Sequence, residues 1–272
     1  GYCNCVIAMF SSGPKKSAAA LASAFLLLWM PSSSSLAASW EKVPAAAEIQ
    51  WRGSLAPRSG PTAAADGAGT TWLFGGYAEP AGKPRAVVND LMRYSLASGW
   101  ELLHEPISLN IGDTERVPGP RLASACAIIG GELLLFGGWD PQTPGTGGII
   151  LDDMWALNLA SQSWSRLDAR MPCGPTSRHV CSNVGGTVVV HTFRCSHSVL
   201  VWDPTSRALV EQPTTGIAPS SRGLHVGVAA DEKTLIIFGG AAKDGSMCSD
   251  AFALDTTTWT WRRLAADNDA PR

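Results

Sequence analysis

Cysteine and histidine side chains, which bind zinc and copper in many proteins, gather in one short stretch of this chain. The stretch holds three cysteines and three histidines: Cys173, His179, Cys181, His191, Cys195 and His197. Structural zinc sites usually contain a closely spaced Cys-x-x-Cys pair, and this stretch has none. We therefore expect these side chains to pack within the fold, and we predict no bound metal.

A four-part pattern recurs along the chain and defines the elements that position these residues. In three complete copies, an arginine precedes an apolar strand that ends in two glycines, an aspartate leads a short strand, and a tryptophan begins the last strand. The copies contain Arg58, Gly75-Gly76, Asp90 and Trp100; Arg121, Gly137-Gly138, Asp153 and Trp164; and Arg222, Gly239-Gly240, Asp250 and Trp261. Self-similarity of this kind is typical of repeat architectures.

A fourth, weaker copy lies between the second and the last of these. It opens at Arg178, and His191-Thr192-Phe193 stands where the other copies have a phenylalanine and two glycines. Leu209 replaces its closing tryptophan. The interval from Gly137 to Gly239 is 102 residues, close to two periods of about 50 residues, so the weaker copy keeps the register of the array.

Each copy predicts four short strands bounded by glycine and proline turns, which form one twisted antiparallel sheet. One such sheet cannot bury both of its faces, so successive sheets stack as the blades of a propeller. The pattern resembles kelch repeats, and the resemblance covers residues 40–272. It implies an all-β, kelch-type β-propeller of four-stranded antiparallel blades, at about 57–104, 119–169, 174–213 and 219–264.

The repeated residues are expected to be structural. Glycine at the end of the second strand permits backbone angles closed to other residues and lets a neighbouring backbone approach. The closing residues Trp100, Trp164 and Trp261 supply large apolar surfaces, so we expect them to be buried between blades. We interpret the recurrent arginine as a tie from one blade to the next, through backbone carbonyls or carboxylates.

Five cysteines lie beyond residue 37, and an odd number leaves at least one without an intramolecular partner. Cys126 and Cys181 occupy equivalent positions on the first strands of adjacent blades. A disulfide needs a Cα separation of about 5.5–6 Å, which such strands exceed, so we expect buried free thiols there. Cys195 and Cys248 fall one position apart in the repeat, just before the third strands of neighbouring blades, and are the candidate disulfide.

An enzymatic reading is tested against galactose oxidase, a kelch-like relative whose copper site uses two tyrosines, two histidines and a cysteine bonded to one tyrosine. Beyond residue 37 this chain has only Tyr77 and Tyr94, and Tyr94 occupies the core aromatic position of a third strand. No nucleophile-elbow, zincin or P-loop pattern is present. We therefore predict no cofactor and no catalysis by this chain.

The loops after the first two double glycines, residues 77–88 and 139–151, are long for hairpin connections and lie on one face of the ring. Aromatic residues beside charged ones on rigidly supported loops suit a protein-binding surface. The candidate partner-binding residues are Tyr77, Lys83, Arg85, Trp139 and Asp140. We expect a protein partner, with a glycan as the alternative. The net charge of −2 and the lack of a basic stripe argue against nucleic acid.

The first 37 residues resemble a secretory signal peptide, with Met9 as the expected initiator. Lys15 and Lys16 precede an apolar run up to Met30, and small residues follow as far as Ala37. We expect a leader over residues 1–37 and a secreted or luminal propeller over residues 38–272. A bipartite plastid leader is one alternative. An uncleaved anchor that places the chain at a membrane is another, although the run is shorter than the roughly 20 residues of a span.

The two ends of the array indicate an incomplete ring. Trp40-Glu41-Lys42-Val43 resembles a closing strand, and Ala270-Pro271-Arg272 resembles the opening of a fifth repeat. A complete four-bladed ring is the alternative. Two functions fit this array: a non-catalytic interaction scaffold, or the propeller part of a larger enzyme or metalloprotein whose catalytic residues lie outside this chain.

Overall fold

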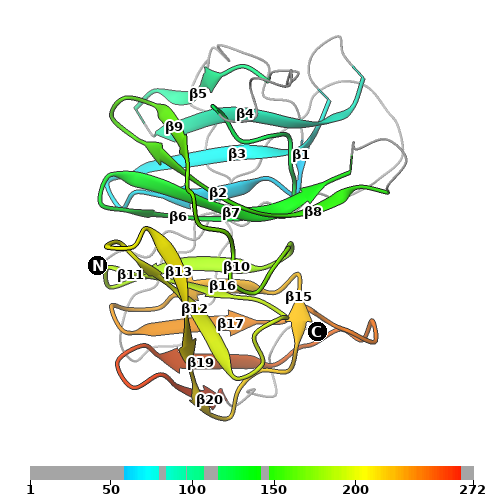
Figure 1. The fold of residues 1–272 in the computed structure, drawn as a ribbon, viewed down its shortest axis with the longest axis vertical. Helices are drawn as coiled ribbons and strands as arrows, with labels where there is room; N and C mark the ends of the chain where they lie inside the picture. Colours follow the sequence, from blue (N-terminus) through cyan, green and yellow to red (C-terminus); the bar gives the residue numbers. More distant parts are fainter. Residues whose placement is uncertain (1–57, 80–83, 96, 107–115, 142–146, 265–272) are drawn as a thin grey trace, which may run out of the picture.

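The computed structural model describes residues 58–79, 84–95, 97–106, 116–141 and 147–264 (Figure 1). Every regular element in these ranges is a β-strand, and the strands build four blades that lie one after another. The predicted all-β fold of four-stranded antiparallel blades is confirmed. The described ranges contain no helix that is long and apolar enough to cross a membrane. The expected leader, the strand at Trp40, the repeat opening at Ala270 and the side chain of Lys83 fall outside them.

Each blade contains four antiparallel strands in chain order. The first blade consists of β2 (Thr62–Ala65), β3 (Thr70–Ala78), β4 (Ala86–Ser95) and β5 (Gly99–His104), and the second of β6 (Ala125–Ile129), β7 (Glu132–Asp140), β8 (Ile149–Asn158) and β9 (Ser163–Arg166). The third consists of β10 (Val180–Val184), β11 (Thr187–His191), β12 (Ser198–Asp203) and β13 (Ala208–Pro213), and the fourth of β16 (Val226–Ala229), β17 (Thr234–Phe238), β19 (Ala251–Asp255) and β20 (Thr260–Arg263).

Four short strands supplement the blades. Strand β1 (Arg58–Ser59) pairs with the end of β3, and β15 (Arg222–Gly223) pairs with β18 (Ala241–Ala242). Strand β14 (Thr215–Gly216) lies parallel to β20 and covers the outer edge of the fourth blade. These pairings satisfy backbone groups that would otherwise be exposed at the ends and edges of the sheets.

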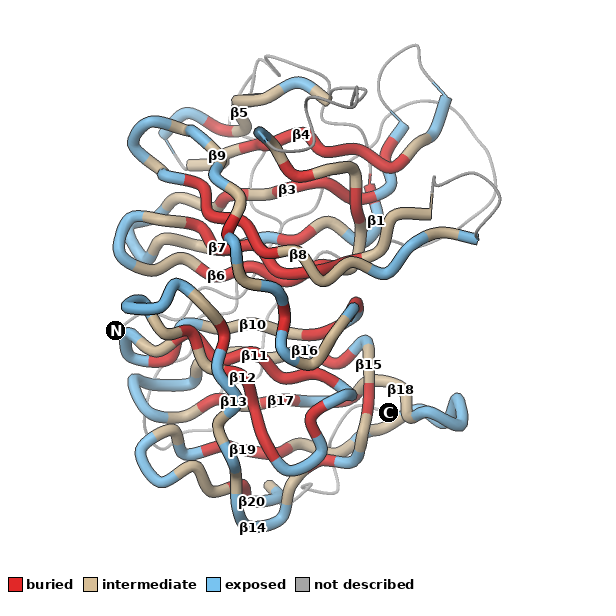
Figure 2. Tube along the Cα trace, viewed as in Figure 1, coloured by how far each residue is buried: buried red, intermediate tan, exposed pale blue. Residues whose placement is uncertain are grey.

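Apolar clusters fill the three interfaces between successive blades. Successive side chains of a strand point to opposite faces of the sheet, so β7 contributes to two interfaces. Leu133 and Leu135 face the first blade, and Leu134 and Phe136 face the third blade, and all four side chains are fully buried. Figure 2 shows buried residues concentrated along the second and third strands of the blades. The blades are therefore held together by face-to-face packing of sheets whose strands are apolar on both sides.

The closing tryptophans differ in burial, contrary to the expectation that all three are buried. Trp261 is 3% exposed, whereas Trp100 and Trp164 are half-buried. Strands β5 and β9 are the outermost strands of their blades, so their side chains keep one flank in solvent, while β14 covers Trp261. Trp164 still packs edge-on against Phe74 of the first blade, with ring centroids 5.2 Å apart.

The double glycines mark bulges where blades approach each other. The register of β3 with β4 shifts between Phe74 and Gly76, and Gly75 has a φ of 68°. A Cβ at Gly75 would lie 2.7 Å from the carbonyl oxygen of Arg121 in the second blade. Only glycine accommodates both the left-handed backbone and this close approach.

Candidate functional site

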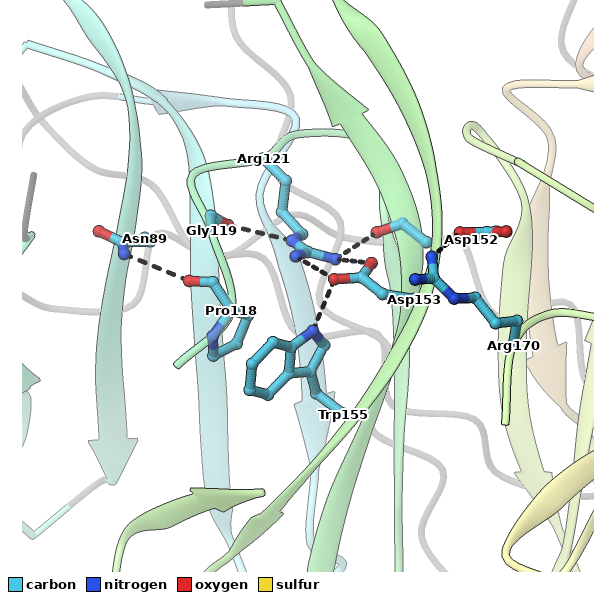
Figure 3. Close-up of polar contacts among 9 residues, drawn as sticks. Asn89, Pro118, Gly119, Arg121, Asp152, Asp153, Trp155 and Arg170 are labelled. Atoms are coloured by element: carbon cyan, nitrogen blue, oxygen red, sulfur yellow. Dashed lines mark hydrogen bonds and ion pairs between the residues drawn. The ribbon is translucent and has the colours of Figure 1, made fainter. Parts of the chain in front are cut away.

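A buried arginine–aspartate pair braces the second blade (Figure 3). The Arg121 guanidinium donates to both carboxylate oxygens of Asp153, at 2.7 and 2.8 Å, and to the carbonyl of Gly137 at 3.0 Å. The indole Nε1 of Trp155 donates to the same carboxylate at 2.7 Å. Burial alone would raise the pKa of Asp153, but the hydrogen bonds from Arg121 and Trp155 outweigh burial and hold the pKa below its ordinary value. This bidentate pair is a structural brace.

The first and fourth blades repeat this brace with Arg58–Asp90 and Arg222–Asp250. Each arginine also donates to the glycine carbonyl of its own blade, Gly75 or Gly239. The side chain therefore ties strands within one blade, which corrects its interpretation as a tie between blades. The backbone at this position reaches the neighbour instead, since the amide of Gly76 donates to the carbonyl of Arg121 at 2.9 Å.

A second set of backbone hydrogen bonds links all four blades. The amide of Ala123 donates to the carbonyl of Gly60, the amide of Arg178 to Ala123, and the amide of Leu224 to Arg178, at 2.9, 2.8 and 3.0 Å. Gly60, Ala123 and Leu224 each lie two residues after the repeat arginine of their blade, and Arg178 is their counterpart in the third blade. All four have a left-handed backbone, with φ of 64° at Gly60, 54° at Ala123, 60° at Arg178 and 60° at Leu224. These three hydrogen bonds, called the backbone relay below, fix the spacing of the first strands of successive blades.

The third blade lacks the arginine–aspartate brace. Its Thr176 occupies the arginine position, because the Thr176 carbonyl accepts from the amide of Gly138 just as the Arg121 carbonyl accepts from Gly76. Arg178, which the sequence suggested as the repeat arginine, is instead the left-handed residue of the relay. Ser198 stands in place of the aspartate and donates to Glu211 at 2.6 Å.

An open pocket of about 660 Å³ lies where the brace is missing, at the end of the third and fourth blades near β15 and β18. Its walls come from β8, the β9–β10 connection, the β11–β12 loop, β12, β13, and the segments around β15 and β18. The side chains that line it include Ile150, Cys173, Ser177, Arg178, Phe193, Arg194, Cys195, Glu211, Leu224 and Lys243. This volume falls within the usual range of ligand-binding pockets.

The charges around the pocket are unequal. Arg178, Arg194 and Lys243 are exposed, and none of them forms an ion pair within the described residues. The carboxylate of Glu211 is already hydrogen-bonded to Ser198. The lining residue Arg222 is neutralised by Asp250, so the accessible wall carries a net positive charge.

Two residues with a left-handed backbone lie at the same pocket. A left-handed backbone costs a residue other than glycine about 1–2 kcal/mol; the first blade has Gly60 at this repeat position, and the second has Ala123, with only a methyl side chain. The third and fourth blades use Arg178 and Leu224, whose large side chains are exposed and line the pocket. The same backbone position therefore places a cationic and an apolar side chain at the pocket wall.

The rim residues proposed from the sequence lie on the hairpins of the first two blades. Arg85 stacks over the ring of Tyr77, with its guanidinium carbon 4.7 Å from the ring centroid. Trp139 and Asp140 follow the bulge of β7, where the backbone of Trp139 pairs with Leu122. None of these four residues lines the pocket. The departure of the third repeat from its pattern was the sequence signal that could have located the pocket.

Three histidines lie buried at the blade interfaces: His191 and His225 meet between the third and fourth blades, and His179 lies close to the backbone of Phe136 in the second blade. His191 Nδ1 and His225 Nε2 are 2.9 Å apart, and the ring of His191 packs edge-on against Trp261. Burial lowers the pKa of His191 to about 3 and that of His179 to about 4, with the neighbouring His225 adding to both shifts. His179 and His225 open the first strands of their blades at equivalent positions. Within the described ranges, no group of three or more histidine, cysteine or acidic side chains is arranged to hold a metal ion.

All five described cysteines are free thiols, so the candidate Cys195–Cys248 disulfide is not formed in the structure. Cys126 is buried and Cys181 is partly buried against the core. Cys195 instead lies with Cys173 at the pocket wall, where the two thiols interact.

Comparison with known proteins places this architecture among curated relatives. The chain is 29% identical to acyl-CoA-binding domain-containing protein 6 of Oryza sativa subsp. japonica, over 68% of the chain and 28% of that relative. It is 32% identical to Adagio protein 3 of Arabidopsis thaliana, over 52% of the chain and 23% of the relative. Acyl-CoA-binding domain-containing protein 4 of Arabidopsis thaliana matches at 29% identity, over 57% of the chain and 24% of the relative. The aligned region thus spans about a quarter of the length of these relatives.

A family model agrees with the repeats and blades described above. The model, described as the KLHDC2/KLHL20/DRC7 Kelch-repeats domain, matches residues 28–199, which is more than half of the chain. The matched region includes the braced first and second blades and most of the unbraced third blade. This chain belongs to the Kelch-repeats domain family.

Proposed function

We propose that this chain is a non-catalytic interaction module that binds a protein partner through the pocket between its third and fourth blades. Kelch-repeat domains commonly serve as protein-interaction modules. The observation that carries the proposal is the accessible positive charge of Arg178, Arg194 and Lys243 around a pocket with exposed apolar side chains.

The chemistry of this pocket favours an acidic peptide segment that also carries an apolar side chain. Arginine guanidinium groups form short, bidentate hydrogen bonds with carboxylates. Phe193 and Leu224 are 37% and 60% exposed and offer apolar contact beside those charges. The guanidinium carbon of Arg194 lies 5.1 Å from the Phe193 ring centroid, which holds a cation and an apolar face together. The stacked pair Tyr77 and Arg85, on the same face, would extend the contact to a larger partner.

The experiment is a selection of random peptides displayed on phage against the full chain. We expect enrichment of peptides with two or more acidic residues next to an apolar residue. Arg194→Glu should weaken the selected peptides about tenfold or more, which corresponds to about 1.4 kcal/mol. Arg262→Glu is the matched control, because it makes the same charge change at an exposed residue of β20 outside the pocket lining.

Three results would count against this function. Enrichment of peptides without acidic residues would exclude the charge argument. An equal loss of affinity in Arg194→Glu and Arg262→Glu would exclude the pocket as the binding site. Binding of glycans in place of peptides would exclude a protein partner.

We further propose that the module acts in the secretory pathway, secreted or luminal. The support is the sequence of the leader: two lysines, an apolar run and small residues up to Ala37. Expression of residues 1–37 fused to a reporter protein tests this location. The reporter should enter the secretory pathway and lose the leader, and a reporter that stays in the cytosol, enters a plastid or keeps the leader would contradict it.

A further inference from the structure

Two cysteines from different segments meet at the wall of the pocket. Cys173 belongs to the connection between β9 and β10, and Cys195 belongs to the loop between β11 and β12. Both residues line the pocket and pack at the same apolar cluster, where their thiols interact. Cys195 is 8% exposed, while Cys173 is partly exposed. The pair therefore has one accessible thiol and one sheltered thiol in contact with it.

The surroundings of Cys173 favour its thiolate. The Sγ of Cys173 lies 3.8 Å from the hydroxyl oxygen of Thr176, which can donate to a thiolate, whereas the carbonyl oxygen of Gly174, at 3.6 Å, accepts from the protonated thiol. The interaction with the Cys195 thiol and, to a smaller extent, Thr176 and the positive charge of Arg194 outweigh burial and lower the pKa of Cys173 to about 7. The same interaction raises the pKa of Cys195, so Cys195 remains the protonated thiol of the pair.

The other described cysteines lack this arrangement. Burial raises the pKa of Cys126 to about 12 and also raises the pKa of Cys181, which makes both thiols poor nucleophiles. Cys248 lies in the segment before β19, in the fourth blade. The site is therefore the pair and its cationic neighbour, and not a general property of the cysteines in this chain.

We propose that Cys173 and Cys195 are a redox-active dithiol that closes to a disulfide when the protein meets hydrogen peroxide, with Cys173 as the attacking sulfur. In the first step, the Cys173 thiolate attacks one peroxide oxygen; an S–O bond forms, the O–O bond breaks, and the hydroxide that leaves takes up a proton to become water. In the second step, the Cys195 sulfur attacks the sulfenic sulfur of Cys173. The S–S bond forms, the S–O bond breaks, and the Cys195 thiol proton leaves with the hydroxide as a second water.

The electron balance is complete with peroxide as the oxidant. Together the two thiols lose two electrons and two protons, and peroxide gains two electrons and becomes two molecules of water. The new bond would link the β9–β10 connection to the β11–β12 loop across the pocket wall. Such a link would alter the binding of a partner there, and this one consequence rests on the proposed function. Formation of the disulfide does not.

The test treats the full chain, reduced and freed of reductant, with a small excess of hydrogen peroxide. Remaining thiols are blocked with N-ethylmaleimide, and the digest is analysed by mass spectrometry without reduction. We expect one linked peptide pair that joins Cys173 to Cys195. We also expect the melting temperature of the oxidised protein to be about 5 °C above that of the reduced protein, because the cross-link restricts the unfolded chain.

Variants assign the two roles. In Cys195→Ser, Cys173 should stop at the sulfenic acid, which dimedone traps; in Cys173→Ser, Cys195 should remain a thiol. Cys248→Ser is the matched control and should keep the link. Arg194→Gln retains both thiols and the fold, so it covers the case in which a cysteine variant does not fold. It should slow closure about threefold and move the midpoint of Cys173 alkylation upward from about pH 7.

Several outcomes would overturn the proposal. A link between Cys195 and Cys248 would assign the disulfide to the pair favoured by the sequence. Oxidation of Cys173 to the sulfinic acid with no link would make it a solitary thiol. Resistance of both thiols to peroxide, or an unchanged rate in Arg194→Gln, would remove the reactivity on which the site depends. Because no partner is needed for these measurements, they fail or succeed independently of the proposed function.

Discussion

The backbone amide of Arg178 donates a 2.8 Å hydrogen bond to the carbonyl of Ala123, and this bond joins the third blade to the second. Both residues hold a left-handed backbone, yet one side chain is a methyl group and the other is an exposed arginine at the pocket. The same relay position thus serves structure in the second blade and presents a cation in the third. Leu224 repeats this dual use in the fourth blade with an apolar side chain.

Removal of the backbone strain at Leu224 should maintain or raise the stability of the fold and lower its affinity for the selected peptides. Leu224→Gly relieves about 1–2 kcal/mol of left-handed strain and loses little burial, because the side chain is 60% exposed. The greater freedom of glycine in the unfolded chain offsets about 0.5–1 kcal/mol of this gain. We expect the free energy of unfolding to be unchanged or up to about 1 kcal/mol higher, while affinity for the selected acidic peptides falls. Urea denaturation and peptide titration measure the two effects. Ile217→Gly, at another exposed residue without a left-handed backbone, should only destabilise.

The buried brace of the second blade should contribute far more to the free energy of unfolding than an exposed ion pair does. Arg121→Ala leaves the carboxylate of Asp153 buried without its partner, so we expect a loss of about 3–5 kcal/mol. Arg207→Ala removes a bidentate but exposed pair with Glu132 and should cost less than about 1 kcal/mol. Denaturant unfolding of the two variants makes the comparison. Equal losses would show that the brace contributes no more than surface charge.

Substitution of Gly137 tests the close approach between the second and third blades. A Cβ at Gly137 would lie 2.5 Å from the carbonyl oxygen of Thr176, whereas a Cβ at Gly130 would meet no atom within 4 Å. Both glycines are left-handed, with φ of 50° and 57°. Gly130→Ala should therefore cost only the backbone strain, about 1–2 kcal/mol. Gly137→Ala adds a clash and should cost about 3 kcal/mol or more. Thermal or urea unfolding distinguishes them, and similar losses would disprove the close approach.

Stability should decline on mild acidification because of the three buried histidines. Burial lowers the pKa of His179, His191 and His225 to about 4, 3 and 4, and the positive charge of Arg222 adds to the lowering at His191 and His225. Their unfolded pKa is about 6.5, so the unfolded chain binds protons first as the pH falls. The stability they contribute is complete above about pH 6.5 and is lost progressively as the pH falls toward their folded pKa values.

Urea denaturation between about pH 7.5 and 5 measures this loss. The slope should approach about 1.4 kcal/mol per pH unit for each histidine. His191→Phe restores the residue type found at this position in the other blades. It should reduce the slope by the contribution of one histidine. A stability that does not change over this interval, or a slope unchanged in His191→Phe, would contradict the neutral buried histidines.

The sequence predicted the parts of this fold that depend on local pattern. Repetition at a fixed period identified the blades, and His191 was correctly aligned with the phenylalanine of the other copies. Alignment of the third repeat's opening failed by two positions, because Arg178 is the nearest arginine while Thr176 makes the brace residue's backbone contact. That register is fixed by pairing with a neighbouring blade, which a local motif does not encode.

The candidate site was harder to predict for a related reason. Long loops after Gly76 and Gly138 drew attention to the first two blades, and these do carry the stacked Tyr77 and Arg85. The pocket, however, arises where the third blade loses its brace and its double glycine. In the sequence, the missing repeat residues indicate only a degenerate repeat. The fold is needed to show that their absence leaves an open pocket lined by cationic side chains.

The central claim, that the pocket binds a partner, is tested most directly by site-specific photocrosslinking. Benzoylphenylalanine is placed at Phe193 in the pocket or at Val210 on β13, which is similarly exposed but outside the pocket lining. Each protein is irradiated with a selected acidic peptide. The account predicts a crosslink from position 193 and none from position 210. A crosslink from position 210 with none from position 193 would contradict it.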